Sequence, residues 1–170
     1  MQRFTSAIRT SIQSENWYAA IFLALTMPDI CSKLETPTSG SSGPRYKAWF
    51  DKFLAGTYTS NIMGRESIFM TSGDCWALRC SLLHEGSDDI GQQNARETLA
   101  RFHFTTLGSH RIRIDNVLVL NTANFCEEMC QAVESWLIAV ATKPEVQERI
   151  ATMIEVKTGA FSPSFGVRLG

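Results

Sequence analysis

Apolar residues at helical spacing dominate the first part of the chain. Phe4, Ile8 and Ile12 recur every four residues, and a denser apolar set follows up to Met27. Residues four apart share one face of a helix, so this pattern predicts one long helix or two stacked helices over these positions. Pro28 is typical of a first helical turn, and a short further helix is therefore expected to begin there.

Residues 36–44 (TPTSGSSGP) form a low-complexity stretch that is rich in Gly, Ser and Pro. Such a composition cannot bury enough apolar surface to order itself, so we expect a flexible surface loop. The aromatic residues that follow predict a helix that packs against the first one and ends near Gly56. These aromatic residues, at helical spacing, are Tyr46, Trp49, Phe50 and Phe53.

Residues 72–85 are expected to form a helix with clear signals at both ends. Ser72 or Asp74 can cap its N-terminus, because short polar side chains accept hydrogen bonds from the N–H groups of the first turn. Gly86 suits the left-handed position that commonly ends a helix.

Two amphipathic helices are expected nearer the C-terminus. Asn121 or Thr122 can cap the first, whose apolar residues recur at helical spacing. Pro144 is placed to open the second. Residues 157–170 lack such a pattern, so we expect a loosely ordered tail there.

Between these helices the period of the pattern changes from helical to alternating. Residues 101–114 contain two alternating runs with Gly108 and Ser109 between them, which predicts a small β-hairpin. Its two faces would differ in character, because alternate residues of a strand point to opposite sides. The apolar face would carry Phe102, Phe104, Ile112 and Ile114, and the basic face Arg101, His103, Arg111 and Arg113.

Composition fits this interpretation and limits the function. A chain of 170 residues that is 44% hydrophobic and 19% charged is typical of one globular domain, residues 1–170. We therefore expect a mainly α fold, a helical bundle with a small β-hairpin insert. The formal net charge of -1 gives no overall attraction to nucleic acid or to an anionic membrane, so such binding would need a local patch.

The cysteines and the apolar runs indicate the compartment. Five scattered cysteines are odd in number, and reduced thiols in the cytosol explain them most simply. The longest apolar run, residues 17–27, is too short to cross a bilayer and does not resemble a secretion signal. We expect a cytoplasmic protein without a membrane-spanning segment.

Arg79 and His84 are the candidate catalytic residues. They lie five positions apart on the helix that Gly86 is expected to end. Cleavage of RNA without a metal needs a base for the 2′-hydroxyl and a cation for the charge that develops on the phosphate, and these two side chains suit those roles. The expected product is a 2′,3′-cyclic phosphate. Five residues turn an ideal helix by about 140°, so the pair should converge only if the helix end loosens or two copies face each other.

The stretch from Leu78 to Gly86 (LRCSLLHEG) resembles the Arg-x-x-x-x-His signature of the HEPN superfamily. The resemblance implies a helical bundle that forms a homodimer and acts as a metal-independent endoribonuclease, with Arg79 and His84 as its catalytic residues. It also implies service as a toxin or defence protein, for which an antitoxin protein is a candidate partner. The sequence departs from many active members at Cys80, where a polar residue commonly follows the arginine.

Each candidate feature also has a structural interpretation. Arg79 and His84 can cover the last carbonyls of their helix, in which case the chain is a non-catalytic HEPN-like module that binds a protein or a nucleotide. The basic strand face is a candidate RNA-binding surface, since backbone phosphate contacts need little more than such charges, or it is simply solvated. Cys126 and Cys130 with the histidines form no compact ligand cluster, so we expect no metal and no cofactor.

Overall fold

A computed structural model describes residues 1–38, 40–62 and 64–169 of the chain. Residues 39 and 170, which belong to the predicted loop and tail, lie outside the described residues. The helices of the described part are α1 (Gln2–Gln13), α2 (Trp17–Glu35), α3 (Ser42–Phe53), the short 3₁₀ helix η1 (Ala55–Tyr58), α4 (Ser72–Glu85), α5 (Thr122–Ala139) and α6 (Pro144–Ala151). Its strands are β1 (Thr59–Ile62), β2 (Arg65–Ile68), β3 (Arg101–Thr105), β4 (Ile112–Ile114), β5 (Val117–Asn121), β6 (Phe161–Ser164) and β7 (Val167–Leu169).

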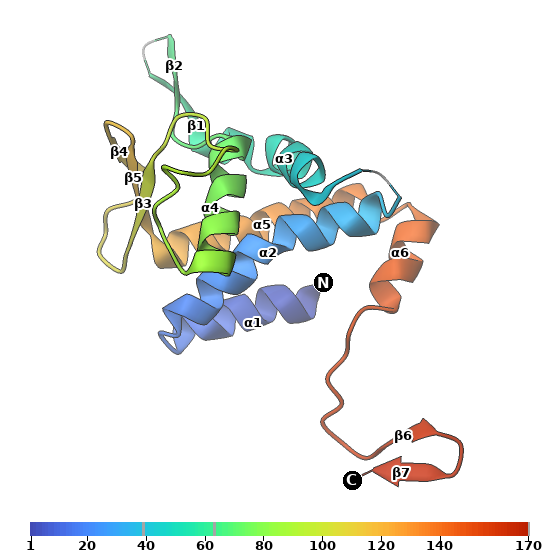
Figure 1. Ribbon diagram of the computed structural model, residues 1–170. Helices are drawn as coiled ribbons and strands as arrows, with labels where there is room; N and C mark the ends of the chain where they lie inside the picture. The colour runs from blue at the N-terminus through green and yellow to red at the C-terminus, as the bar shows by residue number, and fades with distance from the viewer. Residues whose placement is uncertain (39, 63, 170) are drawn as a thin grey trace.

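The expectation of a mainly α bundle with one hairpin insert is wrong. The fold is mixed α and β, with helices combined with a three-stranded sheet and two two-stranded sheets (Figure 1). The three-stranded sheet is itself mixed, because β5 lies between β3, to which it is parallel, and β4, to which it is antiparallel. A parallel pair needs a crossover connection, which a simple hairpin cannot supply.

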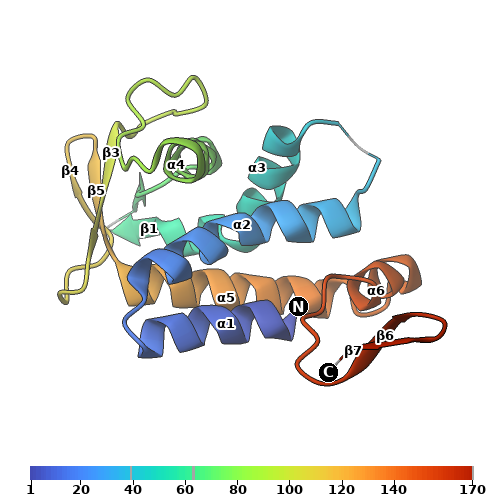
Figure 2. The ribbon, with the colours of Figure 1, turned by 60° about the horizontal axis from the view of Figure 1, so that its bottom comes forward.

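Helix α2 lies at the centre of the helical part. It packs against α1, α3, α4 and α5 (Figure 2). Its middle turns are buried on several sides, since Ala24, Leu25 and Met27 are all fully inaccessible. The small Ala24 lets neighbouring helices approach, while the larger side chains fill the core between them. This burial explains why the apolar run there is so dense.

The break expected at Pro28 does not occur. Helix α2 continues through Pro28 to Glu35, and Pro28 itself is buried inside it. A proline within a helix loses one backbone hydrogen bond, but tertiary packing of the surrounding apolar turns can outweigh that loss. The first apolar segment therefore forms two helices, α1 and α2, separated near Asn16, whose side chain accepts a hydrogen bond from the N–H of Ala19.

The predicted hairpin over residues 101–114 is also wrong in its pairing. Both strand segments exist, but neither pairs with the other, because β5 occupies the place between them. The alternating pattern did not predict β5, a short apolar run (VLVLN) that ends at Asn121, the N-cap of α5. In the observed register Phe102 stands opposite Leu118, whereas Ile112 stands opposite Val119.

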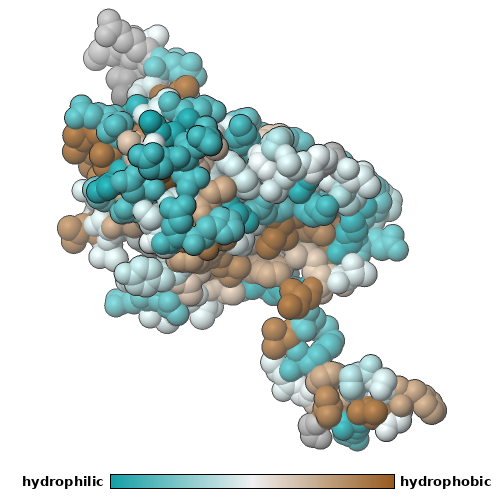
Figure 3. Space-filling model, in the orientation of Figure 1, coloured by the Kyte–Doolittle hydropathy of each residue, from teal (hydrophilic) through white to brown (hydrophobic). Residues whose placement is uncertain are grey.

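This register reverses the predicted face of β4. Phe102 is buried and Phe104 packs edge-on against Phe125 with ring centroids 5.5 Å apart, as expected for inward residues. Ile112 and Ile114, however, are 43% and 63% exposed and lie on the outer face. Figure 3 shows apolar surface at this sheet end of the molecule. The reason is the register of β4 on β5, in which Arg113, and neither Ile112 nor Ile114, stands opposite the buried Leu118.

Several predicted ends are confirmed. Gly86 adopts the left-handed conformation at the C-cap of α4, Asn121 caps α5, and Pro144 stands in the first turn of α6. The helix of aromatic residues also forms and packs on α2, although it ends at Phe53 and Gly56 belongs to the following 3₁₀ turn.

The C-terminal segment leaves the helical body. Strands β6 and β7 form a hairpin that lies apart from the rest of the chain (Figures 1 and 2). Residues 154–169 are exposed throughout, including the apolar side chains of Phe165 and Leu169. The core of the protein is therefore complete by the end of α6.

Candidate functional site

The helix that carries Arg79 and His84 is anchored firmly at its N-terminus. Thr71, rather than Ser72 or Asp74, is the N-cap, and its hydroxyl accepts a hydrogen bond from the N–H of Asp74 at 3.1 Å. The Asp74 carboxylate in turn accepts a hydrogen bond from the N–H of Thr71 at 3.4 Å, which completes a capping box. The sequence signal for this cap was the spacing of three residues between a threonine and an acidic residue.

Asp74 also ties α4 to a distant loop. Its Oδ1 accepts hydrogen bonds from the backbone N–H groups of Glu97, Thr98 and Leu99 at 2.8, 3.0 and 3.1 Å. The carboxylate is fully buried, and burial by itself would raise its pKa. These backbone hydrogen bonds outweigh burial and lower the pKa of Asp74 below its usual value. Asp74 is therefore an ionised structural anchor and not a catalytic acid.

The C-terminal end of α4 is fixed by a second set of contacts. The N–H of Gly86 donates to the carbonyl of Leu82 at 3.0 Å, and the buried hydroxyl of Ser81 donates to the carbonyl of Asp89 at 2.7 Å. The loop after the helix is thus held against its last turn. His84 lies in that turn and is exposed.

Arg79 and His84 meet within one chain. The guanidinium Nη1 of Arg79 lies 3.2 Å from Nε2 of His84, while α4 stays helical through Glu85. The expectation that convergence needs a loosened helix end or a second copy is therefore wrong, because the long arginine side chain reaches along the helix surface. Arginine only donates hydrogen bonds, so His84 Nε2 is the acceptor in this contact.

Asp29 of α2 orients the arginine. Its Oδ2 accepts a hydrogen bond from Arg79 Nε at 2.8 Å, and both side chains are about four-fifths buried. Burial raises the pKa of Asp29, and the Arg79 guanidinium offsets part of that rise. On its other side Arg79 lies over Trp76, with the guanidinium carbon 5.2 Å from the ring centroid. The guanidinium is therefore held by a carboxylate and an aromatic ring.

The cysteines near the pair are not nucleophiles. Burial raises the pKa of Cys80, which follows Arg79, and raises the pKa of Cys75 to about 12. Both thiols thus remain protonated at neutral pH, and only a thiolate would attack effectively. All five cysteines of the chain are free.

The four residues of the predicted basic face lie in two separate parts of the fold. Arg101 bonds to Asp89, and His103 Nδ1 lies 3.5 Å from a carboxylate oxygen of Asp88. Both acids belong to the loop after α4, so Arg101 and His103 lie close in the fold to the helix end that carries His84. The charge of Arg101 is partly neutralised by Asp89 of the same loop.

Arg111 and Arg113 lie elsewhere and serve other contacts. Arg111 is half-buried, has a positive φ of 54° and donates to the backbone carbonyl of Thr57. Arg113 is exposed and donates to the carbonyl of Ile68 at 3.0 Å. The four predicted RNA-binding residues therefore do not form one continuous basic strip.

Asp29 and Trp76, which hold Arg79, were not predicted from the sequence. Asp29 is fifty positions from Arg79, so no local pattern connects the two residues. Trp76 lies three residues before Arg79, the spacing of side chains on one helix face, so that signal was available in the sequence.

A metal site and a membrane-spanning helix each have definite structural requirements. Among the described residues, no three side chains of His, Cys, Asp or Glu gather closely enough to hold a metal ion. Within the same residues, each helix is either too short or too polar to span a bilayer.

Comparison with known protein families, with curated proteins and with solved structures finds no match to this chain. The functional argument therefore depends on the chemistry of its own side chains.

Proposed function

We propose that this protein is a metal-independent endoribonuclease in which His84 is the general base and Arg79 stabilises the phosphate. The observation that carries the proposal is the 3.2 Å contact between Arg79 Nη1 and His84 Nε2, next to the oriented Arg79–Asp29 pair. An imidazole nitrogen that accepts a hydrogen bond and an oriented guanidinium, side by side, are the two groups that cleavage at a 2′-hydroxyl requires.

The reaction begins when a phosphate of RNA replaces His84 as the acceptor for Arg79. The Nε2 lone pair of His84 is then released and takes the proton of the adjacent 2′-hydroxyl. The 2′-oxygen bonds to phosphorus, the bond from phosphorus to the 5′-oxygen breaks, and water protonates the departing oxygen. Arg79 neutralises the charge on the phosphate oxygens throughout. The products are a 2′,3′-cyclic phosphate and a new 5′-hydroxyl end.

RNA binding and assembly complete the proposal. Arg101 and His103 border the loop after α4 and would contact the RNA backbone beyond the cleaved bond, whereas Arg111 and Arg113 are engaged elsewhere. We place the enzyme in the cytoplasm, in keeping with its free thiols. A homodimer with α4 near its twofold axis would join two such sites, and a toxin role would add an antitoxin protein as partner. Light scattering at tens of micromolar tests the dimer.

The experiment incubates the purified protein with single-stranded and structured RNAs and maps new ends. We expect cleavage that persists in EDTA and falls about a hundredfold or more in His84→Ala and in Arg79→Ala. Circular dichroism and unfolding curves establish that both variants still fold. Absence of cleavage by the wild type, or equal cleavage by His84→Ala, would disprove the enzymatic proposal.

A non-catalytic binding module is the second candidate, and one observation favours it. Asp29 neutralises Arg79 and Trp76 covers it, contacts that also suit a purely structural arginine. In that case Arg79→Ala would lower the free energy of unfolding, while RNA would remain uncut by the wild type. Cleavage of RNA by the wild type therefore separates the two candidates, because loss of the Arg79–Asp29 pair would lower the free energy of unfolding in either case.

A further inference from the structure

A groove opens between the C-terminal turn of α2 and the length of α3. Its volume is about 400 Å³, which is within the range of small-molecule sites. The α3 wall is largely apolar, formed by Pro44, Ala48, Trp49 and Phe53. The rings of Trp49 and Phe53 are tilted by 41°, with centroids 5.4 Å apart. These residues recur at helical spacing, so one face of α3 presents a flat apolar surface to the groove.

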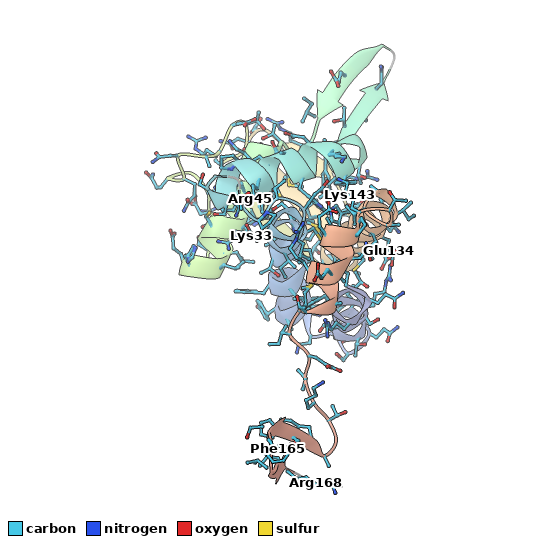
Figure 4. The ribbon with its side chains drawn as sticks, turned by 90° about the vertical axis from the view of Figure 1, so that its right-hand side faces the viewer. Lys33, Arg45, Glu134, Lys143, Phe165 and Arg168 are labelled. Atoms are coloured by element: carbon cyan, nitrogen blue, oxygen red, sulfur yellow. The ribbon has the colours of Figure 1, made fainter. Side chains whose placement is uncertain are left out.

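Positive charge surrounds this apolar wall. Arg45 and Lys52 of α3 line the groove. Figure 4 labels Arg45, Lys33 and Lys143 on this side of the molecule, with the acid Glu134 below Lys143. Glu35 is the one acidic residue among the described residues that line the groove. Its carboxylate accepts hydrogen bonds from Lys143 at 2.7 Å and from the indole of Trp136 at 3.0 Å. Glu35 and Lys143 thus neutralise each other, and the other charged residues that line the groove, Arg45 and Lys52, are both cations.

The start of α3 favours an anionic ligand, and Trp49 of the groove wall carries a buried donor that is unpaired within the described part of the chain. Helix α3 begins beside the groove with Ser41 as N-cap, but Ser41 makes no side-chain capping bond and the first turn holds no acid. The N–H groups of such a helix end favour an anion. In addition, Trp49 is 3% exposed, and its indole N–H has no hydrogen-bond partner among the described residues. Buried donors are nearly always paired, so this one is unusual.

We propose that this groove binds a small organic anion, an aromatic ring that carries a phosphate or carboxylate group. The ring would lie on the apolar α3 wall, and the anionic group would face Lys52 and the start of α3. Neither a neutral ring nor a bare inorganic anion would use both halves of the groove. None of its lining residues belongs to the Arg79–His84 pair, so the site does not rest on the nuclease proposal.

The first test uses the full chain and four probes. Phenyl phosphate and benzoate carry ring and charge, phenol carries only the ring, and inorganic phosphate carries only the charge. Binding is followed by calorimetry and by the NMR signal of the Trp49 indole N–H, assigned with Trp49→Phe. We expect saturable binding of at least one ring-bearing anion, about tenfold or more tighter than phenol or inorganic phosphate. The tighter of the two anions identifies the charged group.

Matched variants locate the site. Lys52→Gln and Lys47→Gln remove the same charge from the same helix, but only Lys52 lines the groove. We expect Lys52→Gln to weaken binding about fivefold or more and Lys47→Gln to leave it unchanged. Ala48→Glu adds a like charge at an exposed wall position and should abolish binding, whereas Ala48→Gln should retain part of it. Absence of saturable binding, equal affinity for phenol, or equal effects of the two lysine variants would overturn the proposal.

Discussion

Asp74 shows how one side chain can fix the geometry of a helix that bears the candidate site. Replacement by Ala leaves three backbone N–H groups of residues 97–99 buried without their acceptor. We expect Asp74→Ala to lower the free energy of unfolding by about 3–5 kcal/mol, measured by urea unfolding. Asp51→Ala, an exposed acid of α3, is the control and should change it by less than about 0.5 kcal/mol. Equal losses in the two variants would contradict this role.

The same residue predicts a pH dependence. The pKa of Asp74 is lower in the folded than in the unfolded chain, so the unfolded state binds its proton first as the pH falls. Its stabilising contribution is therefore complete above the ordinary pKa of an aspartate and is lost in more acidic solution as the folded pKa is crossed. We expect the stability gap between wild type and Asp74→Asn to be constant near neutrality and to shrink below about pH 4. A gap that widens in acid would refute this sign.

At the residue scale, local signals were predictable and distant partners were not. Gly86 and Asn121 were predicted because a helix end depends on residues within one turn of it. The Asp29 contact was not, because it joins two helices whose relative placement depends on the whole core. Thr71 is an intermediate case. Its capping box is a local signal, but Ser72 and Asp74 nearby are also suitable N-cap residues.

At the scale of elements, β5 decides the arrangement of the sheet. Alternation alone predicted strands at 101–105 and 110–114; the first forms with these bounds, and the second is shorter, at 112–114. It could not predict their partners, because the turn residues Gly108 and Ser109 fit a hairpin equally well, whereas the observed parallel pairing of β3 with β5 depends on a third strand. The short β5 run was not recognised as a strand, because it leads directly into the N-cap of α5. Without β5, the two predicted strands had no other partner and were paired with each other. The wrong side chains of β4 were then expected to face the core.

The observed register and the predicted hairpin differ in the stability cost that they predict for substitution of Ile114. Phe102 is fully buried, whereas Ile114 is 63% exposed. We expect Phe102→Ala to lower the free energy of unfolding by about 3–5 kcal/mol, because it leaves a large cavity. Ile114→Ala should cost less than about 1 kcal/mol. Urea unfolding of both variants separates the two arrangements, since a hairpin with Ile114 in the core would show a large loss for each.

At the scale of the whole molecule, the protein consists of a packed body and a projecting C-terminal arm, residues 154–169. The body ends with α6, where Val146 is fully buried and Arg149 donates to the carbonyl of Leu34 at 2.6 Å. The arm beyond it is exposed along its whole length. An isolated two-stranded hairpin is marginally stable in water, so the arm adds little to the stability of the body.

A truncation after Val156 tests this division. Because residues 157–169 bury no side chain, we expect the shortened protein to unfold with a free energy within about 0.5 kcal/mol of the full chain. Val146→Ala is the positive control and should lower that free energy by about 1.5 kcal/mol or more, since it removes buried methyl groups from α6. Urea unfolding measures both. A truncation as damaging as Val146→Ala would mean that the arm packs on the body in solution, because only buried side chains could account for so large a loss.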